Sequence, residues 1–188
     1  MGAESRSVDT IELLGRAVDQ LGTVIADIRP EQADLPTPCA DWDVRALAQH
    51  VIGLDLRNFL VSARGERPDW QEPADPLGPD WSADYAAASA PLLPVWRAAD
   101  LDGPLRSSLD QQIAELTAHS WDLARATNQP TPLDPALAEH SLAWARTALL
   151  PEYRGAGMGF GPEVPVAADA PVYDRLAAWF GRNPAWPF

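Results

Sequence analysis

Apolar residues recur at intervals of three and four along this 188-residue sequence, a spacing that places them on one face of an α-helix. The first stripe predicts a helix over residues 8–28, and Pro30 ends it because proline lacks a backbone N–H and clashes with the preceding turn. Its members are Leu14, Val18, Leu21, Ile25 and Ile28. A second stripe, formed by Val44, Leu47, Val51 and Leu54, predicts a helix over residues 43–60 with Asp43 as its N-cap.

Residues 65–80 are rich in proline, aspartate and glycine, and they predict a loop. A third helix is expected from near Trp81, capped by Asp80 or Ser82, toward Trp96. Pro91 and Pro94 interrupt it, so the segment is either one kinked helix or two short ones. A long helix follows the turn at 102–104 and ends near Asn128, since asparagine tolerates the left-handed conformation of a helix end.

Two shorter helices complete the predicted elements. Asp134 and Pro135 supply an N-cap and a favourable first position for a helix through Leu149, which Pro151 ends. A last helix covers residues 169–180 and is closed by Gly181. The glycine-rich stretch 155–162 lacks a following Lys-Ser/Thr and follows no strand, so it is a lid or a plain connection and not a phosphate loop. The sequence therefore predicts an all-α protein.

Composition narrows the class further. A chain of 188 residues predicts a single domain, residues 1–188. Its formal charge of -13 argues against a nucleic-acid partner or an anionic membrane surface, both of which favour Lys and Arg. No stretch approaches the roughly 18 apolar residues of a membrane span, and no apolar run follows the N-terminus. A single cysteine, Cys39, excludes an internal disulfide and agrees with a reducing compartment, so we expect a cytoplasmic protein.

A candidate metal site begins with Glu115 and His119, which lie on one face of the long helix because they are four residues apart. Leu116 and Leu123 flank this pair, which predicts that it faces inward. A buried carboxylate is costly unless a cation or several hydrogen bonds compensate it. A metal ion fits this requirement, and a solvated surface pair is the alternative.

His50 supplies a second imidazole from another helix, because it lies inside the apolar stripe between Leu47 and Leu54. Two imidazoles and a carboxylate are the ligands of catalytic zinc sites with an open position, and of several non-haem iron sites. The alternative is a core histidine bonded to a backbone carbonyl. Inward-facing ligands on facing helices are typical of a four-helix bundle. His140, the remaining histidine, is expected on the surface.

Other residues are candidates for roles around the metal. Asp122 lies about one turn beyond His119 and is placed to orient a ligand. Arg57, two turns beyond His50, is the candidate cation for a carboxylate substrate, with a solvated helix end as the alternative; Arg154 and Arg182 are weaker candidates. Cys39 is either a small buried residue or a group that approaches the metal or a bound thiol. Trp42, Trp121 and Trp144 are expected in the core, and Trp70, Trp81 and Trp186 as exposed aromatic contacts.

The combined motifs resemble the actinobacterial branch of the DinB/YfiT-like metalloprotein superfamily. The residues that carry the resemblance are 36–39, Trp42-Asp43-Val44-Arg45, His50-Val51-Ile52-Gly53, 115–127, 169–170, 174–176 and 181–184. That branch is similar to the N-terminal domain of mycothiol-dependent maleylpyruvate isomerase, a four-helix bundle that binds a divalent metal through two His and one Glu. The resemblance implies a DinB-like bundle with additional short C-terminal helices, and His50, Glu115 and His119 as metal ligands.

The resemblance also implies mycothiol as a cosubstrate. We expect a divalent metal, zinc first with nickel or iron as alternatives, in an enzyme of thiol transfer or isomerisation acting on a small electrophile. Water activation for hydrolysis is open to the same site. The isomerase has an additional C-terminal domain in its active site, for which the printed sequence leaves no room, so maleylpyruvate isomerisation itself is not expected. The alternative function is a non-catalytic metal or small-ligand binding module that acts as a homodimer.

Overall fold

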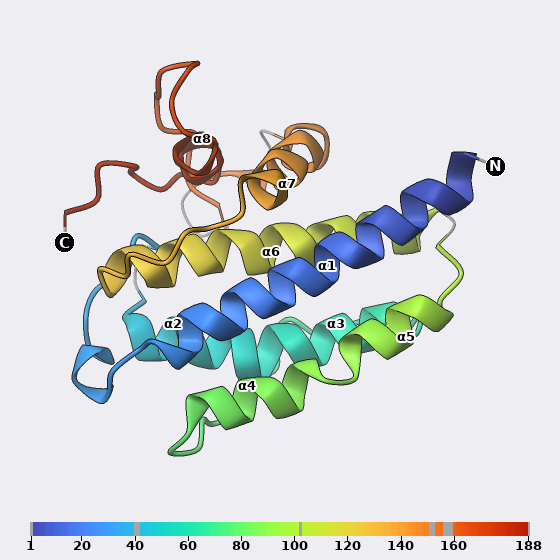
Figure 1. Ribbon diagram of the computed structural model, residues 1–188, viewed down its shortest axis with the longest axis horizontal. Helices are drawn as coiled ribbons and strands as arrows, with labels where there is room; N and C mark the ends of the chain where they lie inside the picture. Colours follow the sequence, from blue (N-terminus) through green and yellow to red (C-terminus); the bar gives the residue numbers. More distant parts are fainter. Residues whose placement is uncertain (1, 40–41, 102, 151–152, 156–159, 188) are drawn as a thin grey trace.

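The computed structural model describes residues 2–39, 42–101, 103–150, 153–155 and 160–187, and of residues 2–9 the backbone alone. Its α-helices are α1 (Gly2–Ala26), α2 (Val44–His50), α3 (Leu56–Ala63), α4 (Trp81–Ser89), α5 (Leu92–Ala98), α6 (Pro104–Ala126), α7 (Pro135–Ala148) and α8 (Val172–Trp179) (Figure 1). Within these ranges the only β pairings are two isolated bridges, Pro36 with Asp43 and Arg154 with Phe160. The prediction of an all-α fold is confirmed.

The bundle has four helical arms, two of which are made of consecutive helices. The arms are α1, the continuous segment α2 to α3, the pair α4 and α5, and α6 (Figure 1). Residues 64–80 return along α3, so that α4 runs in the same direction as α2. Hydrogen bonds fix this return, since Asn58 exchanges two with the backbone of Asp69 and the amide of Asp75 donates to the carbonyl of Gly53. The long crossover therefore lies against the helix that carries His50.

The helix predicted over residues 43–60 contains an irregularity. Between α2 and α3 lies a π-helical turn, η2 (Val51–Asp55), in which the amide of Leu56 donates to the carbonyl of Val51, five residues back. Gly53 is required here, because a Cβ on it would lie 2.3 Å from the carbonyl oxygen of Asp75. π-turns inside α-helices occur frequently at functional sites.

The predicted helix ends are found at several positions. Asp43, Asp80 and Asp134 each cap a helix with the side chain, accepting from Ala46, Ala83 and Ala136 respectively. Pro91 is the N-cap of α5, so the segment from Trp81 onward forms two short helices. Asn128 has φ 51° just beyond α6, and Gly181 has φ 83° just beyond α8. The first helix begins at Gly2, earlier than predicted, and α8 begins at Val172, later than predicted. Residues 102, 151 and 156–159 of the predicted turns lie outside the described residues.

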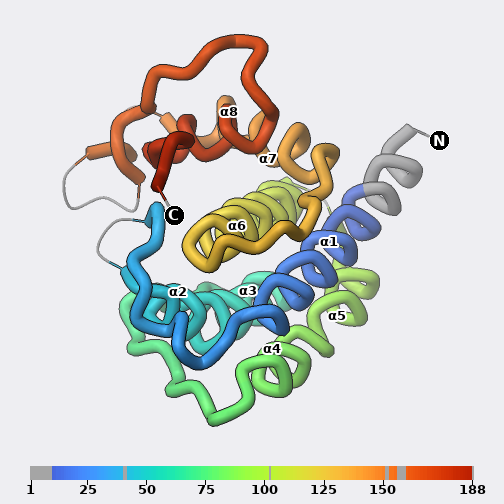
Figure 2. Tube along the Cα trace, turned by 60° about the vertical axis from the view of Figure 1, so that its left-hand side comes forward, coloured from blue at the N-terminus to red at the C-terminus, as the bar shows by residue number. Residues whose placement is uncertain are grey.

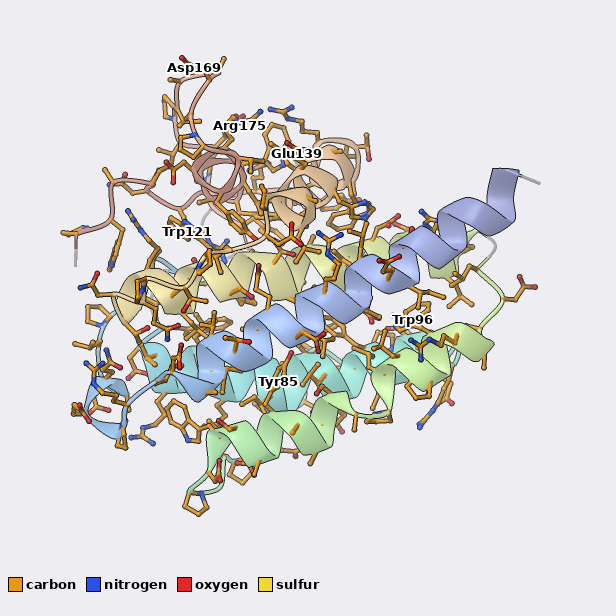
Figure 3. The ribbon with its side chains drawn as sticks, viewed as in Figure 1. Tyr85, Trp96, Trp121, Glu139, Asp169 and Arg175 are labelled. Carbon is orange, nitrogen blue, oxygen red and sulfur yellow. The ribbon has the colours of Figure 1, made fainter. Side chains whose placement is uncertain are left out.

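The core has two parts that share α6. The larger lies inside the bundle, where Tyr85 and Trp96 enter from α4 and α5 (Figure 3). The Nε1 of Trp96 donates to Gln112 on α6 over 2.7 Å. The smaller core joins α6 to α7 and α8, which cover the face of α6 that points away from α2 and α3, and Trp121 lies in it (Figure 2). These are the additional C-terminal helices. No helix in the described ranges has the length and apolar character needed to cross a membrane.

Candidate metal centre

A cavity of about 310 Å³ opens between α2, η2 and α6, at the end of the bundle where the C-terminal segment returns. It is lined by Cys39, Trp42, His50, Asp55, Trp70, Gln111, Glu115, His119, Phe160 and Arg182. Its size lies at the lower end of the range for small-molecule sites, about 300 to 1,000 Å³. The cavity thus brings together all three residues that the sequence proposed as metal ligands.

His50 and Asp55 form the wall that α2 and η2 provide. The Nε2 of His50 lies 3.1 Å from Oδ1 of Asp55, and Asp55 is only 3% exposed. The other oxygen of this carboxylate, Oδ2, is buried and has no hydrogen-bond partner. A buried carboxylate oxygen without a donor is the feature that a bound cation would explain.

The opposite wall is α6, where Oε2 of Glu115 lies 3.6 Å from Nε2 of His119. The two histidine rings approach edge to face, with centroids 5.7 Å apart. The ligating atoms of His50, Asp55 and His119 all lie within 4.8 Å of one another. Donors about 2.1 Å from a common ion lie about 3 to 3.5 Å apart when adjacent and about 4.2 Å apart when opposite. The spacing therefore suits one divalent cation, with Glu115 beside the compact group.

Asp122 lies behind His119, with its Oδ2 3.1 Å from Nδ1 of the ring. The carboxylate also accepts from Arg182, over 3.3 Å from Nε and 3.1 Å from Nη2. An ionised carboxylate can only accept, so Nδ1 of His119 carries the proton and Nε2 directs its lone pair into the cavity. This is the arrangement that orients metal-binding histidines in proteins.

Burial sets the electrostatics of the site. It raises the pKa of Asp55 well above the ordinary value, and the nearby Glu115 raises it further. Burial, followed by the electrostatic effect of the nearby His119, lowers the pKa of His50 to about 3, so this imidazole is neutral. Burial alone would raise the pKa of Asp122, but Arg182 and the hydrogen bond with His119 outweigh it and hold this pKa below its usual range. The site therefore favours neutral or paired groups, and a bound cation would lower the cost of ionising Asp55.

Cys39 lies on the rim of the same cavity and accepts a hydrogen bond from Nη2 of Arg182 over 3.3 Å. Burial raises the pKa of the Cys39 thiol to about 11, although Arg182 opposes this shift. The thiol of Cys39 is therefore protonated at neutral pH. Its sulfur, together with His119 and Asp122, forms a second group of ligating atoms that lie within 4.8 Å of one another.

The structure does not bring Arg57 to the cavity. Its guanidinium pairs with Asp75 over 3.1 Å and with Glu72 over 3.3 Å, on the crossover loop. The prediction assumed a regular α-helix between His50 and Arg57, but the π-turn η2 adds a residue to that turn and rotates Arg57 away from the face of His50. Arg182 lines the cavity instead, and Arg154 donates to backbone carbonyls of residues 161 and 179.

Four of the six tryptophans named in the prediction depart from it, because all four are half-buried: Trp42, Trp144, Trp81 and Trp186. Trp42, expected in the core, is half-buried at the cavity and its ring lies 4.3 Å from that of His50. Trp70 is exposed as predicted, at 39%, and it also lines the same cavity. Trp121 is buried as predicted, whereas Trp144 is half-buried. Two aromatic rings thus line the approach to the histidines.

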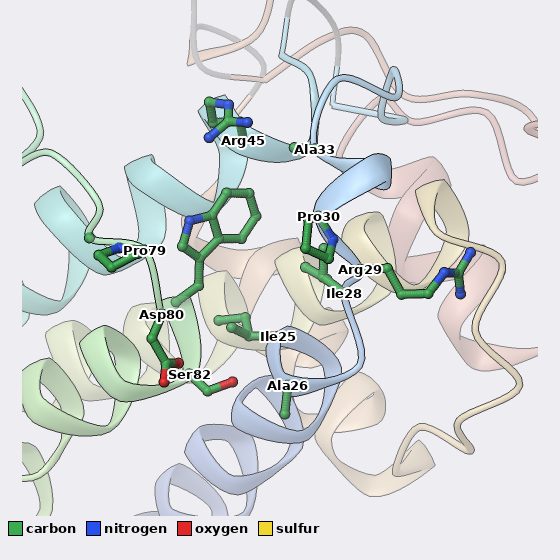
Figure 4. A pocket seen from close by; sticks show the side chains of 12 residues that line it. Ile25, Ala26, Ile28, Arg29, Pro30, Ala33, Arg45, Pro79, Asp80 and Ser82 are labelled. Carbon is green, nitrogen blue, oxygen red and sulfur yellow. The ribbon is translucent and has the colours of Figure 1, made fainter.

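A second cavity, of about 470 Å³, lies between the end of α1 and the start of α4 (Figure 4). Its charged side chains are occupied in local contacts: Asp80 caps α4, Arg29 pairs with Glu31, and the guanidinium of Arg45 stacks on Trp81. Asp80 is the one carboxylate among its lining residues. The smaller cavity, with its group of imidazoles and carboxylates, is the candidate functional site.

Asp55 is the site residue that sequence reasoning missed. In a regular α-helix it would point about 140° away from His50, since each residue turns the helix by about 100°. The sequence did contain a signal, because Gly53 and an acidic residue interrupt the apolar run from Val51 to Leu56. A glycine inside a helix often marks a close backbone approach or an irregular turn.

Comparison with known proteins indicates the family of this chain. The family model of the mycothiol maleylpyruvate isomerase N-terminal domain matches residues 14–150. Two uncharacterised proteins of Mycobacterium tuberculosis, MT0763 of strain CDC 1551 and Rv0738 of strain H37Rv, are each 36% identical to the chain over 176 residues, which cover 89% of this chain and 94% of theirs. No solved structure matches the chain significantly. On the strength of the family match, the chain belongs to the mycothiol maleylpyruvate isomerase N-terminal domain family.

Proposed function

We propose that this protein is a divalent-metal enzyme that uses a low-molecular-weight thiol of the mycothiol type to act on a small electrophile. The observation that carries the proposal is Oδ2 of Asp55, a buried carboxylate oxygen without a partner beside His50 and His119 in a cavity. A bound cation would compensate the cost of burying such an oxygen. The name of the matched family associates this domain with mycothiol, which supplies the thiol half of the proposal.

In this proposal His50, Glu115 and His119 hold the ion, and zinc is the first candidate with nickel or iron as alternatives. A divalent ion bound there supplies Lewis acidity, which favours the deprotonated form of a thiol or of water at neutral pH. Asp122 keeps the proton on Nδ1 of His119 and so leaves Nε2 free to bind. The rings of Trp42 and Trp70 provide the wall against which a substrate packs.

The lining of the cavity indicates the class of electrophile. Arg182 is the one cationic side chain among its described lining residues, and its charge is already balanced by Asp122. A substrate carboxylate would therefore find no uncompensated cation there except the metal. Trp42, Trp70 and Phe160 instead offer apolar surface. We infer that the substrate is small and largely uncharged, with an aromatic or aliphatic face.

Elemental analysis of protein purified without chelator tests the metal half of the proposal. We expect about one divalent ion per chain, lost in His119→Ala and retained in His140→Gln. His140 is a matched control because it also bonds to an aspartate, Asp110, over 2.9 Å but lies outside the cavity. Equal metal content in all three proteins, or none in the wild type, would contradict a site at His119.

Cobalt substitution tests the thiol half. The visible spectrum of the cobalt protein should shift when mycothiol is added, and the loaded enzyme should conjugate mycothiol to a fluorogenic electrophile such as a bimane. A cobalt spectrum that is indifferent to saturating thiol and imidazole would instead support the non-catalytic binding module. The homodimer proposed with that alternative can be checked in the same samples by sedimentation.

A further inference from the structure

The carboxylate of Asp55 is placed as a ligand and not only as a neighbour of the metal site. Its Oδ1 lies 3.1 Å from Nε2 of His50, which is the separation expected of adjacent donors on one ion, about 3 to 3.5 Å. Its Oδ2 is buried and has no hydrogen-bond partner. Asp55 also belongs to the compact group with His50 and His119, whose ligating atoms lie within 4.8 Å of one another.

A second aspartate–histidine pair in the same molecule shows what a purely structural contact looks like. Asp110 lies 2.9 Å from Nε2 of His140 through Oδ1, and its Oδ2 accepts from Arg106 over 3.4 Å. Both oxygens of Asp110 are thus engaged, and a guanidinium balances its charge. Asp55 has neither a second donor nor an ion pair with Lys or Arg among the described residues.

The charges of the side chains that line the cavity also favour Asp55 as a ligand. Asp122 is neutralised by Arg182, which is the one Lys or Arg among the described residues that line the cavity. Two carboxylates, Asp55 and Glu115, therefore have no Lys or Arg salt bridge among the described residues that line the cavity. One divalent ion balances both, whereas Glu115 as the single carboxylate ligand would leave Asp55 buried and uncompensated.

We propose that Asp55 is a fourth protein ligand, so that two imidazoles and two carboxylates hold the divalent ion. This inference rests on the proposed metal site and extends its ligand set of His50, Glu115 and His119. The π-turn η2 allows His50 and Asp55 to bind the same ion, because it brings residues five apart to the same face of the helix. Four protein ligands would close a tetrahedral ion. An open position for a thiol then requires five- or six-fold coordination, which carboxylate-containing sites of iron and manganese provide.

The test uses Asp55→Asn, with Asp110→Asn as the matched control, in the full chain. Metal affinity is measured by competition with a chromophoric chelator, using zinc and iron(II) separately. Removing a ligand should weaken binding by more than about 100-fold, beyond the loss of about 10- to 100-fold typical of a group that only orients a ligand. Asp110→Asn should bind as the wild type does.

The melting temperature supplies an independent readout that does not depend on activity. In chelator-treated protein, Asp55→Asn should melt at the same or a higher temperature than the wild type, because it removes a buried carboxylate that lacks a partner. In metal-replete buffer the order should reverse, since the variant gains less from the ion. A residue with a merely structural role would shift both temperatures in the same direction.

The outcomes separate this inference from the proposed function. If the wild type binds no metal, both fail. If the wild type binds metal through His119 but Asp55→Asn weakens binding by less than about 100-fold, the fourth ligand is overturned and the proposed function stands. Equal losses in Asp55→Asn and Asp110→Asn would also overturn it, because the effect would not be specific to the cavity. A cobalt spectrum with the strong absorption of a tetrahedral ion in the wild type, unchanged in Asp55→Asn, would count against it as well.

Discussion

The Nδ1 of His119 lies 3.1 Å from Oδ2 of Asp122, and this contact connects an imidazole of the cavity wall to the C-terminal segment through Arg182. Asp122 and Arg182 are 60 residues apart in the sequence and both are buried. The C-terminal segment therefore helps to orient the His119 ring on α6. Without this hydrogen bond, packing would not distinguish between the two tautomers of the His119 ring.

Asp122→Asn should weaken metal binding by about 10- to 100-fold, as loss of a carboxylate behind a metal-binding histidine does. The amide can donate to Nδ1, which favours the tautomer with its proton on Nε2, the atom that faces Glu115. The same change leaves Arg182 buried without its counter-charge, at a cost of about 3 to 5 kcal/mol in the free energy of unfolding. Chelator competition and urea unfolding measure the two effects. Unaltered metal affinity in a folded variant would show that Asp122 does not orient His119.

Gly53→Ala should disturb the π-turn and the loop that covers it. The new Cβ would lie 2.3 Å from the carbonyl oxygen of Asp75, so the loop must move away. We expect a loss of about 1 to 3 kcal/mol in the free energy of unfolding, typical of overpacking. Limited proteolysis should cut residues 65–80 faster than in the wild type.

Gly15→Ala is the control for this substitution, because the added Cβ would lie 3.5 Å from Cδ1 of Leu93, at ordinary contact distance. Alanine is favoured over glycine within a helix by about 0.5 to 1 kcal/mol, so this variant should be as stable as the wild type or more so. If Gly53→Ala behaved like Gly15→Ala, the close approach of the loop to η2 would be wrong.

Much of the fold could be predicted from the sequence because helix ends depend on local chemistry. Asp43 and Asp134 cap helices through their own side chains, and Asn128 takes the left-handed conformation beyond α6. The π-turn could not be predicted in this way, since the apolar stripe up to Val51 is the same in an α-helix. Because the π-turn was not predicted, two of its effects were not predicted either. Asp55 lines the cavity, and Arg57 points away from it and pairs with Asp75. The role of Arg182 depends on a contact across 60 residues, which periodicity does not reveal.

Cys39 should react slowly with iodoacetamide at neutral pH, because the thiolate is the reactive form. Burial raises its pKa from 9.0 to about 11, so its thiolate population at pH 7 is about 100-fold smaller than in the unfolded chain. Labelling followed by mass spectrometry, with urea-unfolded protein as the reference, measures the ratio of rates. The rate should rise with pH until about pH 11. Equal rates in the folded and unfolded protein would contradict the burial of Cys39 beside Arg182.

Tyr85→Phe should destabilise the protein near neutral pH and lose this effect in alkali. The hydroxyl of Tyr85 donates to the carbonyl of Val18 over 2.8 Å, and such a bond contributes about 0.5 to 1.5 kcal/mol. Burial, with the charge of Asp19, raises the pKa of Tyr85 well above its ordinary value of 10.0. Above pH 10 the unfolded chain therefore loses this proton while the folded chain keeps it, so the free energy of unfolding of the wild type falls as pH rises.

Phenylalanine has no ionisable hydroxyl, so the free energy of unfolding of Tyr85→Phe does not include this decrease with pH. Each pH unit above 10 removes about 1.4 kcal/mol from the wild type relative to the variant, so the two stabilities should cross near about pH 11. Urea unfolding of both proteins between pH 8 and 11.5 measures the crossing. Tyr153→Phe is the control, because Tyr153 is 53% exposed and the same hydroxyl is removed from the surface. A constant difference between wild type and Tyr85→Phe over this range would show that the Tyr85 hydroxyl ionises as readily in the folded protein as in the unfolded chain.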